Sequence, residues 1–370
     1  MEQLVKAAVE KGASVIHIKA GDVFRCRVEG KVFKLSTTRF TAEDTRRIAL
    51  QLIPNDRDRG RINELQDYDC SWGLDDVGRF RVNILRQRGS FMIIMRAIPW
   101  SIPTLEELGL PAVLSEIVDL SHGLVLVTGG VGTGKTTTQA SMIDWVNKNR
   151  QKHIITLEDP IEFLHADDAS TITQREIGVD TDSFRTGLRA ALRQDPDIIL
   201  IGEMRDKDTI ETAIRASELG QLVISTMHTP TATSTISHLM AVFPDEEKEL
   251  ARIRVADTLK AVISQRLLMR TDDESRIPAL EIMLVTPAIQ DCILTSKPAE
   301  TIQALIEAGR ETYGMQSFQQ CLQDLVRSGQ VSYETAKAGS ENPSDFELYM
   351  QTLAGDGQAD SLGPAVGSRF

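Results

Sequence analysis

Hydrophobic positions in the first hundred residues follow short patterns of two kinds. Two stretches repeat apolar residues at helical spacing, "MEQLVKAAVEKG", which ends at Gly12, and "AEDTRRIALQLI". Four others alternate apolar and polar residues and are interrupted by the turn-like "EGK" and "RQRGS", which predicts hairpins. These are "SVIHIKA", "VFRCRVEGKVFKL", "YDCSWGL" and "GRFRVNILRQRGSFMIIMRAI". We therefore predict a small domain of antiparallel strands and helices over residues 1–98, followed by a proline-rich linker over residues 99–107.

From residue 108 onward, continuous apolar runs alternate with helical patterns. Such runs, without polar alternation, are typical of parallel strands that helices cover on both faces. The expected strands are "GLVLVTGG", "HIITLED", "DIILIGE" and "QLVISTMHT", and the expected helices are "KTTTQASMIDWVNKN", "DSFRTGLRAALRQ" and "KDTIETAIRASELG". Thr181 or Asp182 should cap the second helix, and Gly220 should end the third.

The region after Thr286 has mostly helical patterns. We predict an α/β domain with a helical C-terminal part over residues 108–352. Residues 353–370 are rich in Gly and Ala and have no periodicity, so we expect them to be disordered.

Composition narrows the classes of partner. The 370 residues carry a net charge of −12, which argues against nucleic-acid binding, since proteins that bind phosphate backbones are usually basic. No apolar run is long enough to cross a bilayer, and the N-terminus lacks a signal-peptide core. The chain has four widely separated cysteines without C-x-x-C spacing, so we expect buried thiols in a cytoplasmic protein: Cys26, Cys70, Cys292 and Cys321.

The stretch "TGGVGTGKTTT" fits the phosphate-binding pattern G-x-x-x-x-G-K-[ST] between a predicted strand and a predicted helix. Glycines let backbone N–H groups surround phosphates, and the helix N-terminus adds positive potential. Lys135 would contact the β- and γ-phosphates of ATP, and the Thr136 hydroxyl would ligate Mg²⁺. The predicted nucleotide-binding residues are Gly129, Gly130, Val131, Gly132, Thr133, Gly134, Lys135, Thr136 and Thr137.

Further candidates follow the predicted strands, at the edge where parallel sheets bind ligands. Glu203 ends "DIILIGE" and would hold magnesium or orient water. His228 lies at the end of the strand predicted in "QLVISTMHT" and would sense phosphate or donate to the transition state. A general base for the attacking water could be any of three carboxylates in "TLEDPIEF", namely Glu158, Asp159 and Glu162.

An arginine-rich segment precedes the α/β domain. Arg79 and Arg81 should share one face of a strand, with Phe80 and Val82 on the other. Two interpretations remain: a solvated hairpin face, or arginine fingers that point at the nucleotide of the same or a neighbouring subunit. The segment contains Arg79, Arg81, Arg86, Arg88 and Arg96.

Taken together, the motifs resemble those of the type II/IV secretion ATPases. The stretches "ITLEDPIEF", "ITQREIGVDTDSF", "RQDPDIILIGEMRD", "ISTMHT" and "AVISQRLL" are most similar, in order and spacing, to the PilT/PilU twitching-motility ATPases that retract type IV pili. The resemblance covers nearly the whole chain. It implies a PAS-like N-terminal domain over residues 1–98 and a RecA-like P-loop ATPase domain over residues 108–352.

The resemblance also implies roles and partners. A homohexamer would bind ATP and Mg²⁺ on the cytoplasmic side of the inner membrane, at the pilus base, and would remove pilin subunits through a membrane platform protein. Glu162 would be the general base, and Glu203 the Walker B glutamate, which binds Mg²⁺ directly or through water. His228 would be the His-box histidine, and Arg81 and Arg96 would reach the nucleotide.

The chain departs from the family pattern at three motifs. Ser-Asp-Leu-His becomes Ser14–His17, and Glu-Thr-Gly-His becomes Glu218–Gln221. The motif Ala-Ile-Arg-Asn-Leu-Ile-Arg-Glu, tied to retraction, becomes "AIQDCILT", with Gln290 and Leu294 in place of the arginines. Two roles therefore stay open: an independent retraction motor, or an accessory paralogue that works beside another retraction ATPase.

Three other functions are alternatives. One is a non-catalytic ring component that binds ATP without turnover, and the complete set of acidic residues and lysine argues against it. Pilus extension or secretion ATPases usually carry longer N-terminal regions and a four-cysteine zinc motif, neither of which is found in this sequence. A RecA-like DNA translocase would share the core fold, but the acidic charge and the lack of basic loops count against it.

Overall fold

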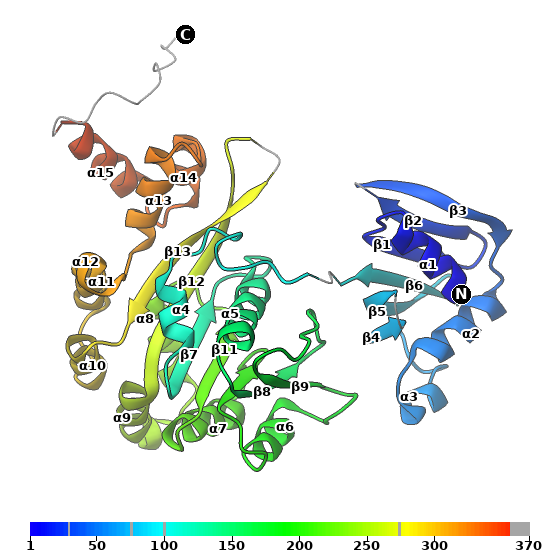
Figure 1. Ribbon diagram of the computed structural model, residues 1–370, viewed down its shortest axis with the longest axis horizontal. Helices are drawn as coiled ribbons and strands as arrows, with labels where there is room; N and C mark the ends of the chain where they lie inside the picture. Colours follow the sequence, from blue (N-terminus) through cyan, green and yellow to red (C-terminus); the bar gives the residue numbers. More distant parts are fainter. Residues whose placement is uncertain (29, 75–76, 99–100, 273–274, 356–370) are drawn as a thin grey trace, which may run out of the picture. The chain divides into compact units, whose positions relative to one another are not determined.

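The computed structural model describes residues 1–28, 30–74, 77–98, 101–272 and 275–355 (Figure 1). Its internal contacts define two compact units. The first unit contains Met1–Ile102, Thr156–Ala166 and Ile172–Gly187. The second unit contains Pro103–Ile155, Asp167–Thr171 and the described residues from Leu188 onward.

The N-terminal part of the first unit is a six-stranded antiparallel sheet with helices, as the sequence predicts. The strand order is β3-β2-β1-β6-β5-β4. The strands are β1 (Val15–Lys19), β2 (Val23–Val28), β3 (Lys31–Arg39), β4 (Asp67–Leu74), β5 (Gly78–Gln87) and β6 (Ser90–Ala97). The helices are α1 (Glu2–Glu10), α2 (Ala42–Leu52) and α3 (Asp56–Gly60).

Strand β5 has one buried face and one more exposed face. Phe80 and Val82 are fully buried in the hydrophobic core of this unit. Because successive side chains of a strand point to opposite faces, Arg79 and Arg81 lie on the other side, as predicted. The core thus fixes which way the arginines project.

A second sheet has seven strands in the order β13-β12-β7-β11-β10-β8-β9. Strand β7 pairs in parallel with β11 and β12, and β10 pairs in parallel with β11. Strand β7 is buried along its whole length, as are β10 and β11, which fits the continuous apolar runs of the sequence. The strands are β7 (Gly123–Thr128), β8 (His153–Glu158), β9 (Thr171–Glu176), β10 (Ile198–Ile201), β11 (Leu222–Met227), β12 (Leu259–Met269) and β13 (Arg276–Leu284).

Helices connect these strands and continue beyond them. Helix α4 (Val113–Val118) precedes β7. Between the strands lie α5 (Lys135–Asn149), α6 (Phe184–Ala191), α7 (Lys207–Glu218), α8 (Ala232–Ala241), the short 3₁₀ helix Asp245–Glu247 and α9 (Lys248–Thr258). The C-terminal part is helical, as predicted, with α10 (Pro287–Leu294), α11 (Ala299–Ala308), α12 (Arg310–Tyr313), α13 (Phe318–Arg327), α14 (Tyr333–Gly339) and α15 (Pro343–Gly355).

Several details differ from the prediction. The sheet is not purely parallel, because β12 pairs antiparallel with β13, and neither this hairpin nor β9 was expected. Helix α6 is capped by Ser183, whose Oγ accepts from Thr186 N at 3.2 Å, and not by Thr181 or Asp182. Residues 353–355, assigned to a disordered tail, belong to α15, and the rest of that prediction lies outside the described residues.

The structure tests the predictions about cysteines and membrane-spanning segments. All four cysteines are buried and free, as expected. Among the described residues, no helix combines the length and the apolar character that crossing a membrane requires.

Candidate functional site

The loop between β7 and α5 depends on glycines. Gly129, Gly132 and Gly134 have positive φ angles of +140°, +78° and +87°, a region that L side chains rarely adopt. A Cβ on Gly129 would lie 2.4 Å from the backbone oxygen of Gln265. The loop thus requires glycine at position 129. It leads into the N-terminus of the 15-residue helix α5, where backbone N–H groups and the helix dipole favour the binding of an anion.

Lys135 lies inside this loop. Its Nζ donates to the carbonyl oxygens of Gly129, at 2.9 Å, and Gly130, at 2.7 Å. The residue is only 8% exposed, and burial lowers the pKa of its ammonium, whereas the charge of Glu203 opposes this shift. The loop thus surrounds a buried cation that phosphate oxygens could contact.

Glu203 and His228 meet at the carboxyl ends of neighbouring strands β10 and β11. Glu203 Oε2 lies 3.5 Å from His228 Nε2, and its Oε1 lies 2.8 Å from Nε of Arg205. The segment around Glu203 is fixed to β11, because Thr226 Oγ1 donates to Gly202 O at 2.6 Å. The sequence analysis did not identify Arg205, since an exposed arginine in a loop gives no pattern.

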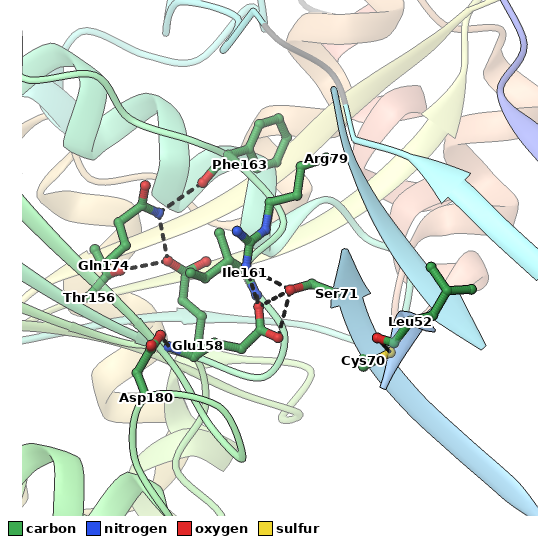
Figure 2. A network of polar contacts seen from close by, with 11 residues as sticks. Leu52, Cys70, Ser71, Arg79, Thr156, Glu158, Ile161, Phe163, Gln174 and Asp180 are labelled. Carbon is green, nitrogen blue, oxygen red and sulfur yellow. Dashed lines mark hydrogen bonds and ion pairs between the residues drawn. The ribbon is translucent and has the colours of Figure 1, made fainter. Parts of the chain in front are cut away.

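The carboxylates of Glu158 and Glu162, both in "TLEDPIEF", differ in how deeply they are buried. Glu158 is buried and accepts from Thr156 Oγ1 at 2.7 Å and Gln174 Nε2 at 3.1 Å (Figure 2). Burial raises the pKa of Glu158, so a structural role suits it. Glu162 has a side chain that is 38% exposed, and its Oε1 accepts from Arg81 Nη1 at 3.2 Å. Of these two, Glu162 is the one that water can reach.

Arg81 and Arg96 lie directly opposite each other on β5 and β6. Like charges in this position repel, and the carboxylate of Glu162 offsets part of the repulsion. The structure therefore brings Arg81, Arg96 and Glu162 together in the first unit. Lys135, Glu203 and His228 come together in the second unit. The catalytic and nucleotide-binding roles of these residues stay predictions.

Arg79 contacts a different carboxylate, Glu176, which the sequence analysis missed. Arg79 Nη2 donates to Glu176 Oε2 at 2.8 Å, and Ser71 Oγ lies 2.7 and 2.6 Å from the two carboxylate oxygens (Figure 2). The backbone N–H of Ile161 also donates to Glu176, at 3.2 Å. Glu176 thus links strands β4 and β5 to the residue before Glu162.

A further buried glutamate holds the segment after His228. Glu281 of β13 is 2% exposed and accepts from Ala232 N, in the first turn of α8, at 2.7 Å. Burial raises the pKa of Glu281 to about 7. The Thr231 side chain caps the same helix end. These contacts fix the start of α8, four residues after His228.

Comparisons with known proteins show the family of this chain. A family model for "Type II/IV secretion system protein" matches residues 1–345. The chain belongs to the type II/IV secretion system protein family. It is 40% identical over 344 residues to the type IV pilus retraction ATPase PilT of Pseudomonas aeruginosa, covering 93% of this chain and 99% of that protein. It is also 36% identical over 363 residues to the type IV pilus ATPase PilU of the same bacterium, covering 98% and 94%.

Two solved structures have the same fold. The crystal structure of the pilus retraction motor PilT with bound ADP has a TM-score of 0.84 and 40% identity, covering 94% of this chain and 98% of that chain. The ATPase DotB of Legionella pneumophila has a TM-score of 0.81 and 26% identity, covering 95% of both chains. The predicted family, the α/β P-loop ATPase fold and the ATPase class are thereby confirmed.

The glycine geometry gives a first prediction. Gly129→Ala should raise the dissociation constant for ADP at least about ten-fold, because its Cβ would collide with Gln265 and the φ angle is unfavourable for alanine. Gly130→Ala should lose much less affinity, since a Cβ there lies no closer than 3.9 Å to Thr133. Titration with a fluorescent ADP analogue measures both. Equal losses for the two variants would contradict this account of the loop.

The buried pair gives a second prediction. Glu176→Ala should lower the free energy of unfolding by up to about 3–5 kcal/mol, because it leaves the partly exposed Arg79 guanidinium without its carboxylate partner. Glu64→Ala is the control, since it breaks an exposed pair with Arg61 that should contribute little to stability. Chemical denaturation followed by circular dichroism measures both variants. A similar small loss in both would show that the Glu176 contacts do not stabilise the unit.

Proposed function

We propose that the chain is a Mg²⁺-dependent ATPase that works as a homohexameric motor of type IV pilus retraction. The observation that carries this proposal is the 40% identity to PilT, with 93% of this chain and 99% of PilT covered. The convergence of Lys135, Glu203 and His228 after β7, β10 and β11 supports it, because P-loop ATPases act at this edge of the sheet.

Each side chain has a chemical role in this proposal. Loop amides and the Lys135 ammonium would bind the phosphates of ATP, and the Thr136 hydroxyl and Glu203 would hold Mg²⁺. These two residues offer the hard oxygen ligands that Mg²⁺ prefers. Bound Mg²⁺ supplies positive charge that neutralises the phosphates. His228 would donate to phosphate oxygens beside Glu203.

The first unit would contribute the general base and two cations. Glu162 is accessible to water, and its carboxylate can accept a proton. Arg81 holds this carboxylate, and Arg96 lies beside Arg81 on the next strand. Guanidinium groups stabilise charge that develops on phosphate oxygens, so these arginines would act on the nucleotide of the same or a neighbouring subunit.

The proposed motor would work on the cytoplasmic side of the inner membrane, at the pilus base, with a platform protein and the pilin machinery. An accessory role beside a paralogous retraction ATPase has support from α10. Gln290, where retraction motors have an arginine, donates to Asp257 Oδ1 at 3.0 Å, and Leu294, at the second arginine position, is 40% exposed. This helix therefore presents less positive charge than an arginine-bearing motif would.

The enzymatic part can be tested with purified protein. Lys135→Ala and Glu203→Ala should each reduce ATP hydrolysis at least about 100-fold, since each removes a charge that the transition state needs. Lys34→Ala is a matched control, because Lys34 is exposed on the edge strand β3. Phosphate release measures turnover. Near-normal turnover in either site variant would refute these roles, and stimulation by DNA would favour a DNA translocase.

The motor function can be tested in cells. Deletion of the gene should slow or stop pilus retraction, and restoring the parent chain, but not Glu203→Ala, should recover it. The assay follows labelled pili in cells with and without a second retraction ATPase. A defect only when that ATPase is present indicates the accessory role. Normal retraction in both backgrounds would reject a retraction function, and loss of pilus assembly would favour an extension motor.

A further inference from the structure

The side-chain amide of Gln265, on β12, contacts both the loop between β7 and α5 (the phosphate loop) and the start of α5. Its Nε2 donates to Thr133 O at 2.6 Å, and its Oε1 accepts from Thr138 Oγ1 at 2.8 Å. Gln265 is only 3% exposed, and its bond to Thr138 is buried, whereas its bond to Thr133 is partly buried. One buried amide thus connects the loop to the first turns of α5.

The same residue lies against the glycines at both ends of the loop. Its backbone oxygen would be 2.4 Å from a Cβ on Gly129, and its Nε2 would be 2.8 Å from a Cβ on Gly134. Next to it, Ser264 Oγ accepts from Thr128 Oγ1, the last residue of β7, at 2.9 Å. Strand β12 therefore supports the loop from its start to the helix.

The hydrogen bond to Thr133 O has a consequence for phosphate binding. In a planar trans peptide, the C=O of one residue and the N–H of the next point in opposite directions. Because Gln265 draws the Thr133 carbonyl toward β12, the Gly134 N–H must point away from β12. Backbone N–H groups at such a helix N-terminus bind anions when they point out of the loop.

We propose that Gln265 is a positioning residue that fixes the Thr133–Gly134 peptide so that its N–H is available to the phosphates of the bound nucleotide. This inference rests on the proposed function, since it requires that ATP binds at this loop. Glutamine suits the position because it donates and accepts at once. Methionine of similar size does neither, and an ionised glutamate only accepts.

The neighbouring residue Arg266 provides a control on the opposite face of the same strand. Its guanidinium donates to Gly339 O and Glu341, each at 2.7 Å, and lies 4.1 Å from the ring centre of Phe318. These partners belong to the C-terminal helical region and not to the loop. Arg266→Met therefore perturbs β12 without removing a bond to the phosphate loop.

The test compares three variants of the full chain: Gln265→Met, Gln265→Glu and Arg266→Met. Calorimetric titration gives the dissociation constant for Mg-ADP, steady-state kinetics gives KM and kcat for ATP, and thermal unfolding gives Tm with and without Mg-ADP. Gln265→Met removes both side-chain hydrogen bonds. Because the bond to Thr133 positions the N–H, this variant should raise the dissociation constant and KM about ten-fold, with kcat within about three-fold. Gln265→Glu should lose more affinity, because its carboxylate faces the Thr133 carbonyl.

The control should behave differently. Arg266→Met should lower Tm and keep the dissociation constant for ADP within about two-fold, whereas the Gln265 variants should lose most of the Tm increase that ADP produces. ADP affinity within about two-fold of the parent in both Gln265 variants would overturn the proposal, as would an equal loss in Arg266→Met. A parent chain that binds no ADP would refute the proposed function as well. ADP binding and hydrolysis by the parent, with unaffected Gln265 variants, would refute the positioning role alone.

Discussion

The close approach of β12 to the loop between β7 and α5 is the constraint on which the candidate site depends. The Gln265 backbone leaves no room for a side chain on Gly129, and its side-chain amide connects Thr133 of the loop to Thr138 of α5. Glycine at position 129 is thus required by packing as well as by the backbone angle. Lys135 is then held over the loop carbonyls, beside the strand ends that carry Glu203 and His228.

The first unit depends on a comparable buried contact. Glu176 accepts from Arg79, Ser71 and the backbone of Ile161, and so joins the antiparallel sheet to the segment that carries Glu162. A buried carboxylate of this kind is costly unless all its partners are present. A change in one partner of Glu176 would therefore alter the position of Ile161, the residue before the proposed general base Glu162. These contacts connect the antiparallel sheet to the proposed catalytic residue.

Local patterns predicted much of this molecule. Continuous apolar runs identified β7, β10 and β11. The alternation of polar and apolar residues predicted that Arg81 and the buried Phe80 lie on different faces of the same strand. The P-loop spacing and the strand ends identified Lys135, Glu203 and His228.

Strand β9, with the polar sequence "TITQRE", has no such pattern, and its register depends on neighbours distant in the sequence. Gln265 and Glu176 were missed for the same reason. The partners of Gln265 are 127–132 residues away, and Arg79 and Ser71, the side-chain partners of Glu176, are 97–105 residues away. Burial, which distinguishes Glu158 from Glu162, is likewise a property of the folded chain.

The central claim is that the phosphates of a nucleotide bind in the loop that β12 supports. A crystal structure with Mg-ADP tests it most directly. The account predicts the diphosphate against the backbone N–H groups that lead into α5, with Lys135 Nζ on a phosphate oxygen and the Gln265 bonds to Thr133 and Thr138 retained. A diphosphate bound elsewhere, or one bound in the loop after the Gln265 bonds have broken, would contradict it.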